Sequence, residues 1–153
     1  MTHVSEAIGI ARAAKAAGIP LSMGLTVETD GRLPTGQSLA DAIEDIDACG
    51  AAPAYYMINC AHPDHFRNTL AVAAEGGGDG SWRDRILAIR ANASRKSHAE
   101  LDEATELDAG DPIGLGHDYM VLRSFLPNLR VLGGCCGTDH RHISAIADAY
   151  LEE

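Results

Sequence analysis

The sequence predicts an α/β protein built from parallel βα units. Four short apolar runs alternate along the chain with segments that have the periodicity of helices. The runs are apolar nearly throughout, which is typical of parallel strands whose two faces are both covered. Cysteines follow two of the runs, at the carboxyl ends where parallel α/β folds, barrels and open sheets alike, carry their functional groups.

Each predicted helix is bounded by residues that start or stop helices. Gly18 ends the first helix. Ser38 is a suitable N-cap, with Asp41 in the first turn of the same helix. Thr138 and Asp139 have the same roles at the last helix. The predicted helices cover residues 5–17, 38–49, 63–75, 113–125 and 138–151, and the predicted strands cover residues 21–27, 54–59, 85–91 and 129–134.

Three connections between these elements are distinctive. Residues 28–36 form a loop with turn chemistry at Asp30 and Gly31. The glycine-rich residues 76–80 are expected to be a flexible connector. Residues 92–112 form a polar loop of about twenty residues, and loops of that length in compact domains are usually functional or mobile.

The composition indicates one globular domain. The chain has 153 residues, of which 46% are hydrophobic and 22% are charged. The formal net charge of −10 argues against a nucleic-acid or anionic-membrane partner. No apolar stretch is long enough to span a membrane and no secretory signal opens the chain, so a cytoplasmic location is expected. In that reducing compartment, the four cysteines are expected to be metal ligands, catalytic groups or core residues rather than disulfides.

Three of the cysteines lie at the ends of two predicted strands. Cys60 ends the run 55–60, and Cys135 and Cys136 follow a glycine pair. These three thiols suggest one soft-metal site with an open position, and the alternative is that they are buried structural residues. Adjacent strand residues point to opposite faces, so Cys135 and Cys136 can share an ion only if the backbone turns between them, as the neighbouring glycines allow. A disulfide between adjacent residues would be strained, and Cys49, at a helix end, is expected in the core.

The histidines offer a second, weaker metal pattern. The spacing of Cys60, His62 and His65 resembles that of metal ligands. A proline and an aspartate between the two histidines predict a helix start, however, so both are expected to be solvated residues of a first turn. His140 and His142 are expected on the surface of the last helix.

Two motifs make a family resemblance visible. Asn59-Cys60 follows one strand, and Gly-Gly-Cys-Cys-Gly-Thr at residues 133–138 follows the last one. With these motifs the chain resembles the zinc-dependent homocysteine S-methyltransferases, and residues 26–31 and 89–94 are similar to the corresponding segments of that family. Its members are (β/α)₈ barrels of about 250 residues or more. The resemblance therefore implies a partial TIM barrel of about four strands, in which residues 1–153 are the carboxy-terminal half of the domain and the amino-terminal half is absent.

The resemblance also implies a function. The chain is expected to transfer a methyl group from a sulfonium or ammonium donor to the thiol of homocysteine, giving methionine, with Zn²⁺ as cofactor. Cys60, Cys135 and Cys136 are the implied metal ligands and catalytic residues. Residues that end strands on the same side are candidates for substrate binding, namely Glu28, Asn59 and Asn92.

Two other interpretations remain open. Without the amino-terminal half, the chain could be a non-catalytic zinc-binding half-barrel or a truncated fragment. The strands at residues 21–27 and 129–134 would then have unpaired edges, which predicts homodimerisation or association with a separate amino-terminal half. A thiol redox protein using Cys135 and Cys136 is a weaker hypothesis, since the chain has no Cys-x-x-Cys pair.

Overall fold

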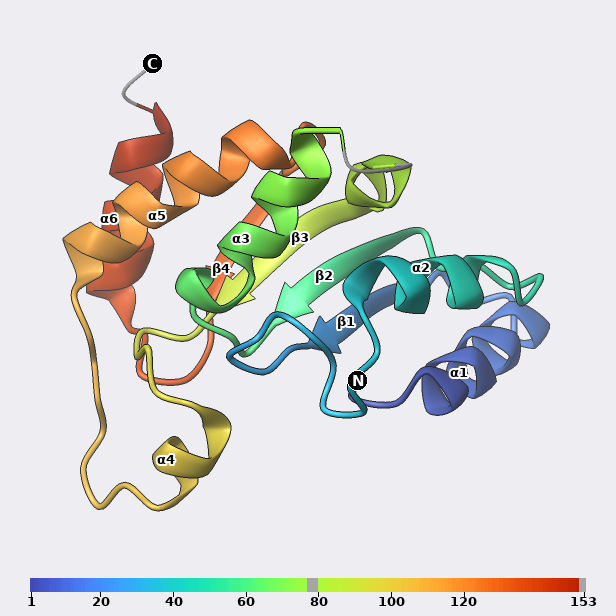
Figure 1. Cartoon of the computed structure of the whole chain (residues 1–153), viewed down its shortest axis with the longest axis horizontal. Helices are drawn as coiled ribbons and strands as arrows, with labels where there is room; N and C mark the ends of the chain where they lie inside the picture. Colours follow the sequence, from blue (N-terminus) through green and yellow to red (C-terminus); the bar gives the residue numbers. More distant parts are fainter. Residues whose placement is uncertain (77–79, 152–153) are drawn as a thin grey trace.

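The computed structural model describes residues 1–76 and 80–151, and its centre is a parallel sheet of four strands. The strands lie in the order β1-β2-β3-β4, and each pairs in parallel with the next one along the chain (Figure 1). Their bounds are Ser22–Thr26 for β1, Tyr55–Asn59 for β2, Ile86–Ala91 for β3 and Val131–Gly134 for β4. The predicted α/β class with about four parallel strands is confirmed.

All five predicted helices form, with ends that differ by a few residues at most from the predicted ones. They are α1 (Val4–Ala16), α2 (Leu39–Asp47), α3 (Pro63–Ala74), α5 (Pro112–Phe125) and α6 (His140–Leu151). Two short elements were not predicted: the 3₁₀ helix η1 (Gly80–Arg85) and helix α4 (His98–Asp102), which lies inside the long polar loop. The predicted glycine connector lies partly outside the described residues, since residues 77–79 are not among them.

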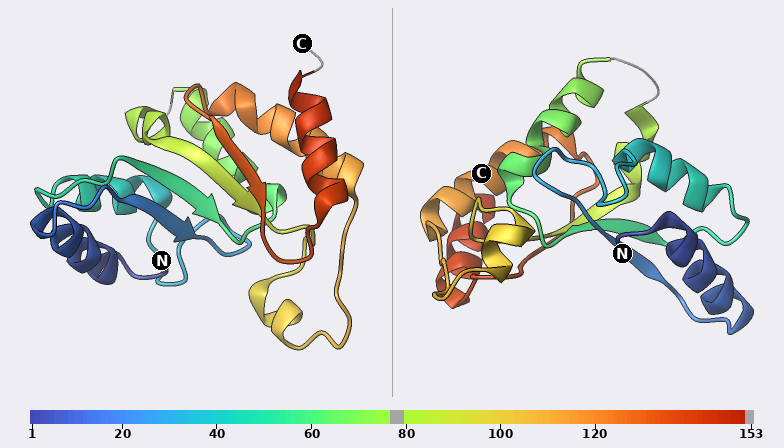
Figure 2. Two further views of the ribbon diagram at one scale, coloured as in Figure 1. Left: turned by 180° about the vertical axis from the view of Figure 1, so that it is seen from behind. Right: turned by 60° about the horizontal axis from the view of Figure 1, so that its bottom comes forward.

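The helices α2, α3 and α5 cover one face of the sheet, and Figure 2 (left) shows the strands in front of them. Leu25, Ile58 and Ile89 are in register across β1, β2 and β3 and are buried beneath this layer. The next row, with Asn59 and Arg90, points to the opposite face and is half-buried or exposed. The prediction that both faces are covered is therefore wrong for the described part of the chain. Helices on one face of sequentially ordered strands are typical of a barrel segment.

The core lies between this helical layer and the sheet. Helix α2 contributes Leu39, Ile43 and Ile46, helix α3 contributes Phe66 and Leu70, and helix α5 contributes Leu115, Tyr119 and Leu122. Burial of each large apolar side chain stabilises the fold by about 1.5–3 kcal/mol, so this layer fixes the strand ends that carry the site. Cys49 packs against the same core, as predicted.

The outer strands of the sheet have different environments at their edges. The amide of Thr26 donates to the carbonyl oxygen of Met1 at 3.0 Å, so the first residues lie along the outer edge of β1. In the described residues, no strand pairs with the outer edge of β4. Among residues 1–76 and 80–151, no helix combines the length and the apolar character needed to cross a membrane.

Candidate metal centre

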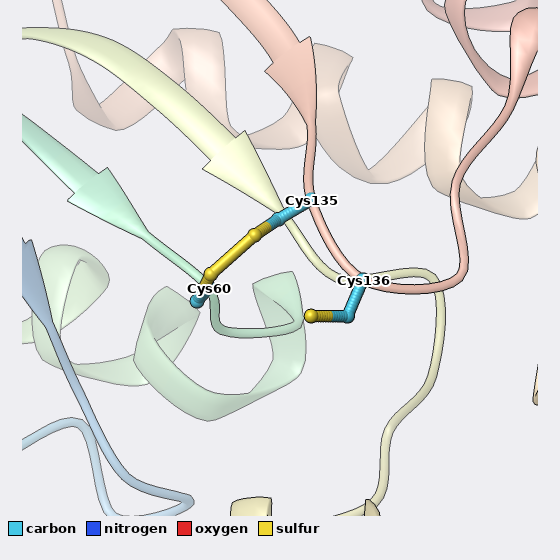
Figure 3. A group of neighbouring side chains, drawn as sticks. All are labelled: Cys60, Cys135 and Cys136. Atoms are coloured by element: carbon cyan, nitrogen blue, oxygen red, sulfur yellow. A yellow bond between two sulfur atoms is a disulfide. The ribbon is translucent and has the colours of Figure 1, made fainter.

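Three cysteine side chains meet at the carboxyl ends of β2 and β4 (Figure 3). The Sγ atoms of Cys60, Cys135 and Cys136 all lie within 4.8 Å of one another. Cys60 and Cys135 form a disulfide with a Cα–Cα distance of 5.6 Å, whereas the thiol of Cys136 is free and exposed. The structure thus brings together the three residues that the sequence selected.

The disulfide corrects one prediction, because the sequence favoured four reduced cysteines. The physical reason lies in the convergence of the two strand ends. A Cα separation of 5.6 Å is in the range that disulfides require. Two cysteines whose side chains approach this closely can form a disulfide or bind one metal ion together. The short distance alone therefore does not distinguish a disulfide from a metal site.

The backbone at Cys60 has an unusual conformation. Its φ angle is 53°, and it is the one non-glycine residue with positive φ in the described part of the chain. An L-residue in this left-handed region is disfavoured by about 1–2 kcal/mol, and such residues concentrate at functional sites. The Cys60 amide still donates to the carbonyl oxygen of Arg90 at 2.9 Å, so the turn begins while the strand is still hydrogen-bonded to β3.

Cys135 and Cys136 lie at a turn, which is the condition for both of them to share one ion. The Cys135 amide donates to the Ala91 carbonyl at 2.7 Å, and the Cys136 carbonyl accepts from Ala93 at 3.0 Å. Gly137 follows with a φ of 79°. A Cβ at Gly137 would collide with the backbone of Asp108, so only glycine fits this close approach. The turn removes the strict alternation of a strand and lets both thiols approach Cys60.

The side chain of Asn92 joins the two cysteine loops. Its Nδ2 donates to the carbonyl oxygen of Cys60 at 3.0 Å, and its Oδ1 accepts from the amide of Cys136 at 3.2 Å. Only 2% of the residue is exposed. The substrate-binding role expected of Asn92 stays a prediction, while its contacts give it a clear structural task.

The other two candidate substrate residues lie at neighbouring strand ends. Glu28 follows β1, and its Oε2 lies 3.1 Å from Nδ1 of His98 in α4. Asn59 ends β2, is half-buried and points to the face of the sheet away from the helices. Their roles towards a substrate stay predictions.

One functional candidate was missed by sequence reasoning. Nη2 of Arg90 lies 3.5 Å from Sγ of Cys135, and a cation beside a sulfur stabilises its thiolate form. The sequence did carry a signal, since Arg90 is the single charged residue in the otherwise apolar run of β3.

The histidine predictions are partly wrong. His62 is only 3% exposed, and its Nδ1 accepts from the amide of Asp64 at 3.1 Å as the N-cap of α3. Burial lowers the pKa of His62 to about 4, and the nearby positive charges of Arg95 and Arg67 act in the same direction. His142 is fully buried as well. Its Nδ1 accepts from the amide of Asp139 at the start of α6, and its Nε2 lies 2.7 Å from the carbonyl oxygen of Ala109.

The buried His62 forms a second cluster with two carboxylates. Its ring and the side chains of Asp64 and Asp118 offer ligand atoms within 4.8 Å of one another. Both carboxylates, however, form ion pairs with Arg67, and Asp64 also pairs with Arg95. The two negative charges are thus balanced by two guanidinium groups, which is typical of a structural ion-pair network.

A cavity opens beside the free thiol of Cys136. It has a volume of about 310 Å³ and is lined by Cys136, Leu101 and Asp102 together with residues 104–108. Its wall is therefore the long loop that contains α4. The side chain of Ser94 fixes the far end of this loop, because its Oγ donates to Asp108 at 2.7 Å.

The donor set fits a soft divalent metal ion. Zn–S bonds of about 2.3 Å in a tetrahedron place ligand sulfurs about 3.8 Å apart. The three Sγ atoms, all within 4.8 Å of one another, can reach this spacing after reduction of the disulfide by small side-chain rotations. Hard cations such as Mg²⁺ and Ca²⁺ prefer oxygen ligands, so an all-sulfur site disfavours them.

The fold and the site define a parallel β/α protein with a three-thiol cluster at the ends of its strands. The sequence matches the model of the family described as Homocysteine S-methyltransferase over residues 1–150, and the chain belongs to this family. The resemblance noted from the motifs is thereby confirmed. No curated protein sequence matches the chain significantly.

Proposed function

We propose that this chain binds one Zn²⁺ through Cys60, Cys135 and Cys136 and supports methyl transfer to the thiol of homocysteine, giving methionine. The observation that carries the proposal is the convergence of the three Sγ atoms within 4.8 Å at the strand ends. Membership of the Homocysteine S-methyltransferase family supports the substrate class. Thiolate ligands require a reducing environment, so a cytoplasmic location is part of the proposal.

The charges at the site suit a thiolate nucleophile. When bound, Zn²⁺ would deprotonate the substrate thiol near neutral pH, whereas a free thiol has a pKa of about 8.5. With Zn²⁺ bound, Cys60, Cys135 and Cys136 as thiolates would give the centre a net charge of −1, and three protein ligands would leave room for the substrate sulfur. This excess negative charge keeps a neighbouring substrate sulfur electron-rich, and Arg90 compensates part of the charge at Cys135.

A cationic donor fits the same charges. In the transfer, the substrate sulfur forms a bond to the methyl carbon. The bond from that carbon to the donor sulfonium or ammonium breaks, and the donor leaves as a neutral molecule with the electron pair. No general base is needed in this step, because the thiol proton would already have been released to water when the substrate bound. Glu28 and Asn59 are proposed to contact the substrate, since both lie at strand ends on the same side as the thiols.

The second candidate is a zinc-binding half-barrel that has no catalytic activity by itself. The observation that favours it is the sheet face without helical cover in the described part of the chain. Parallel sheets are almost always covered on both faces. Either a second copy of this chain or a separate amino-terminal half is then the expected partner.

Metal analysis tests the zinc site directly. The protein is reduced, loaded with Zn²⁺ and desalted, and about one equivalent of zinc per chain is expected. Cys136→Ser should lose the metal, whereas Cys49→Ser, which changes a thiol of the core, should keep it. Unchanged zinc content in Cys136→Ser would rule out the assignment.

A methyl-transfer assay separates the two candidate functions. Methionine formation from homocysteine is measured with sulfonium and ammonium donors, with and without a candidate partner half. Turnover by the chain alone would refute the non-catalytic interpretation. Zinc binding without turnover under any of these conditions would refute the catalytic one.

A further inference from the structure

The carbonyl oxygen of Cys60 accepts two hydrogen bonds from distant side chains. One comes from Nδ2 of Asn92 at 3.0 Å, and the other comes from Nε2 of His98 at 2.6 Å. Because a carbonyl oxygen can only accept, Nε2 of His98 is the donor. Cys60 is the one non-glycine residue with a left-handed backbone in the described part of the chain. The two donors on its carbonyl oxygen restrain it in this disfavoured conformation.

His98 is itself held in place from two directions. Its Nδ1 lies 3.1 Å from Oε2 of Glu28, which follows β1, and this contact is an ion pair when the ring is protonated. It is also the first residue of α4, directly after the capping box formed by Ser97 and Glu100. The amide and the hydroxyl of Ser97 each contact Oε2 of Glu100 at 2.8 Å. The imidazole therefore links the end of β1, the end of β2 and the long loop.

The direction of the Cys60 side chain depends on this link. In the left-handed conformation, the Cα–Cβ bond of Cys60 directs Sγ to Cys135 and Cys136 across the end of β3. A relaxation of the backbone to negative φ would turn Sγ away from the other two sulfurs. Removal of a hydrogen-bonding residue that orients a metal ligand typically lowers the metal affinity by about 10–100-fold.

We propose that His98 is a positioning residue that holds Cys60 in its metal-binding conformation through the hydrogen bond from Nε2 to the Cys60 carbonyl. The inference rests on the proposed function, since it presupposes that Cys60 is a ligand. His98 touches the backbone of Cys60 and not its sulfur, so its role is to fix geometry rather than to take part in the reaction.

The test compares three substitutions of His98 in the full chain. His98→Ala removes both contacts. His98→Gln keeps an amide N–H near the position of Nε2, and His98→Asn places its amide too far from the Cys60 carbonyl. His140→Ala is the matched control, because His140 is an exposed histidine on α6. Zinc affinity is measured by competition with a chromophoric chelator, and the cobalt-loaded proteins are compared by their sulfur-to-cobalt charge-transfer and d–d absorption bands.

The expected result is a zinc Kd about tenfold higher for His98→Ala and His98→Asn, with weaker or shifted cobalt bands. His98→Gln and His140→Ala should stay within about threefold of the wild type. Thermal unfolding of each metal-free protein shows whether it is folded. If His98→Ala fails to fold, the comparison of His98→Gln with His98→Asn decides.

The outcomes separate the two proposals. If the wild type binds no zinc after reduction, the proposed function fails. If the wild type binds zinc and a folded His98→Ala or His98→Asn binds it equally well with the same cobalt spectrum, only the positioning role of His98 is overturned. Equal losses in His98→Gln and His98→Asn would also overturn it, because the donated hydrogen bond would then not be the relevant contact.

Discussion

A single buried amide holds both cysteine loops together. Asn92 donates to Cys60 and accepts from the amide of Cys136, and no water can replace its contacts easily because the residue is 2% exposed. Asn92→Ala should lower the free energy of unfolding by about 1–3 kcal/mol, since the Cys136 amide loses its partner and the Cys60 carbonyl keeps only the bond from His98. Chemical denaturation measures this difference.

The control for Asn92 is Asn128, whose exposed side chain donates to the backbone of Asp84 at 2.9 Å. Asn128→Ala should change the free energy of unfolding by about 0.5 kcal/mol or less. A loss in Asn92→Ala no larger than in Asn128→Ala would contradict the bridging role.

His62 gives the stability a defined pH dependence. Its pKa is about 4 in the fold, below the ordinary value of 6.5, because burial disfavours the charged ring. Between these two values the unfolded chain binds the proton and the folded chain does not, so the free energy of unfolding decreases as the pH falls from 6.5 to 4. The loss attributable to His62 should be about 2–3 kcal/mol, and it is absent above pH 6.5.

The contribution of His62 is isolated with His62→Asn. Asparagine is also a good N-cap, so the helix start at Pro63 is preserved. Denaturation midpoints are measured from pH 7 to pH 4 for both proteins. Parallel pH profiles for the wild type and the variant would show that the buried ring is not the source of the dependence.

How far the site could be predicted differs from residue to residue. The meeting of Cys60 with Cys135 and Cys136 could be predicted because parallel strands end at one edge of a sheet. The left-handed turn at Cys60 and the two hydrogen bonds by which Asn92 joins the cysteine loops depend on tertiary contacts that no local pattern encodes. The burial of His62 likewise depends on how α3 packs.

Helices α5 and α6 approach each other closely at a glycine. A Cβ on Gly116 would lie 2.6 Å from the carbonyl oxygen of Ala145 in α6, so the two helices would have to separate. Gly116→Ala should therefore lower the free energy of unfolding by about 1–3 kcal/mol. Thermal or chemical denaturation provides the measurement.

The matched control lies in another helix. Gly9 is exposed within α1, and a Cβ there would meet nothing within 4 Å. Gly9→Ala should stabilise the protein by about 0.5–1 kcal/mol, because alanine loses less conformational entropy in a helix. The two substitutions are chemically identical and should have opposite signs, and the same sign for both would refute the contact between α5 and α6.

At the scale of elements, local signals explain what the sequence could predict. The N-cap at Ser38 forms as expected, with its side chain accepting from the amide of Asp41 at 3.1 Å. Helix α4 was missed because five residues are too few to show a periodicity, although Ser97 and Glu100 carry a capping-box signature. The bare face of the sheet agrees with the partial barrel that the resemblance implied. The apolar strands alone suggested cover on both faces, because an apolar run does not show which layer covers it.

At the scale of the whole molecule, the sheet face opposite the helices is expected to bind a partner. Without an amino-terminal half, the purified chain should pair with a second copy and have twice the chain mass by light scattering at micromolar concentration. Met57 lies on this face, so Met57→Glu should shift the equilibrium to monomer.

The control for this prediction is Val72, which is 56% exposed on α3 in the helical layer. Val72→Glu should leave the mass unchanged. A wild-type chain that is a clean monomer across the concentration range would contradict self-association. Dissociation by Val72→Glu would place the contact on the helical side instead.

The spacing of the ligands has a consequence for the order of assembly. Cys60 and Cys135 are 75 residues apart, and β3 lies between the strands that carry them. A nascent chain that has completed only β2 and Cys60 offers one of the three ligand thiols, and the loop after β4 offers the other two. All three sulfurs are together only once β3 is inserted and β4 has docked, so metal capture would report that folding of this sheet is complete.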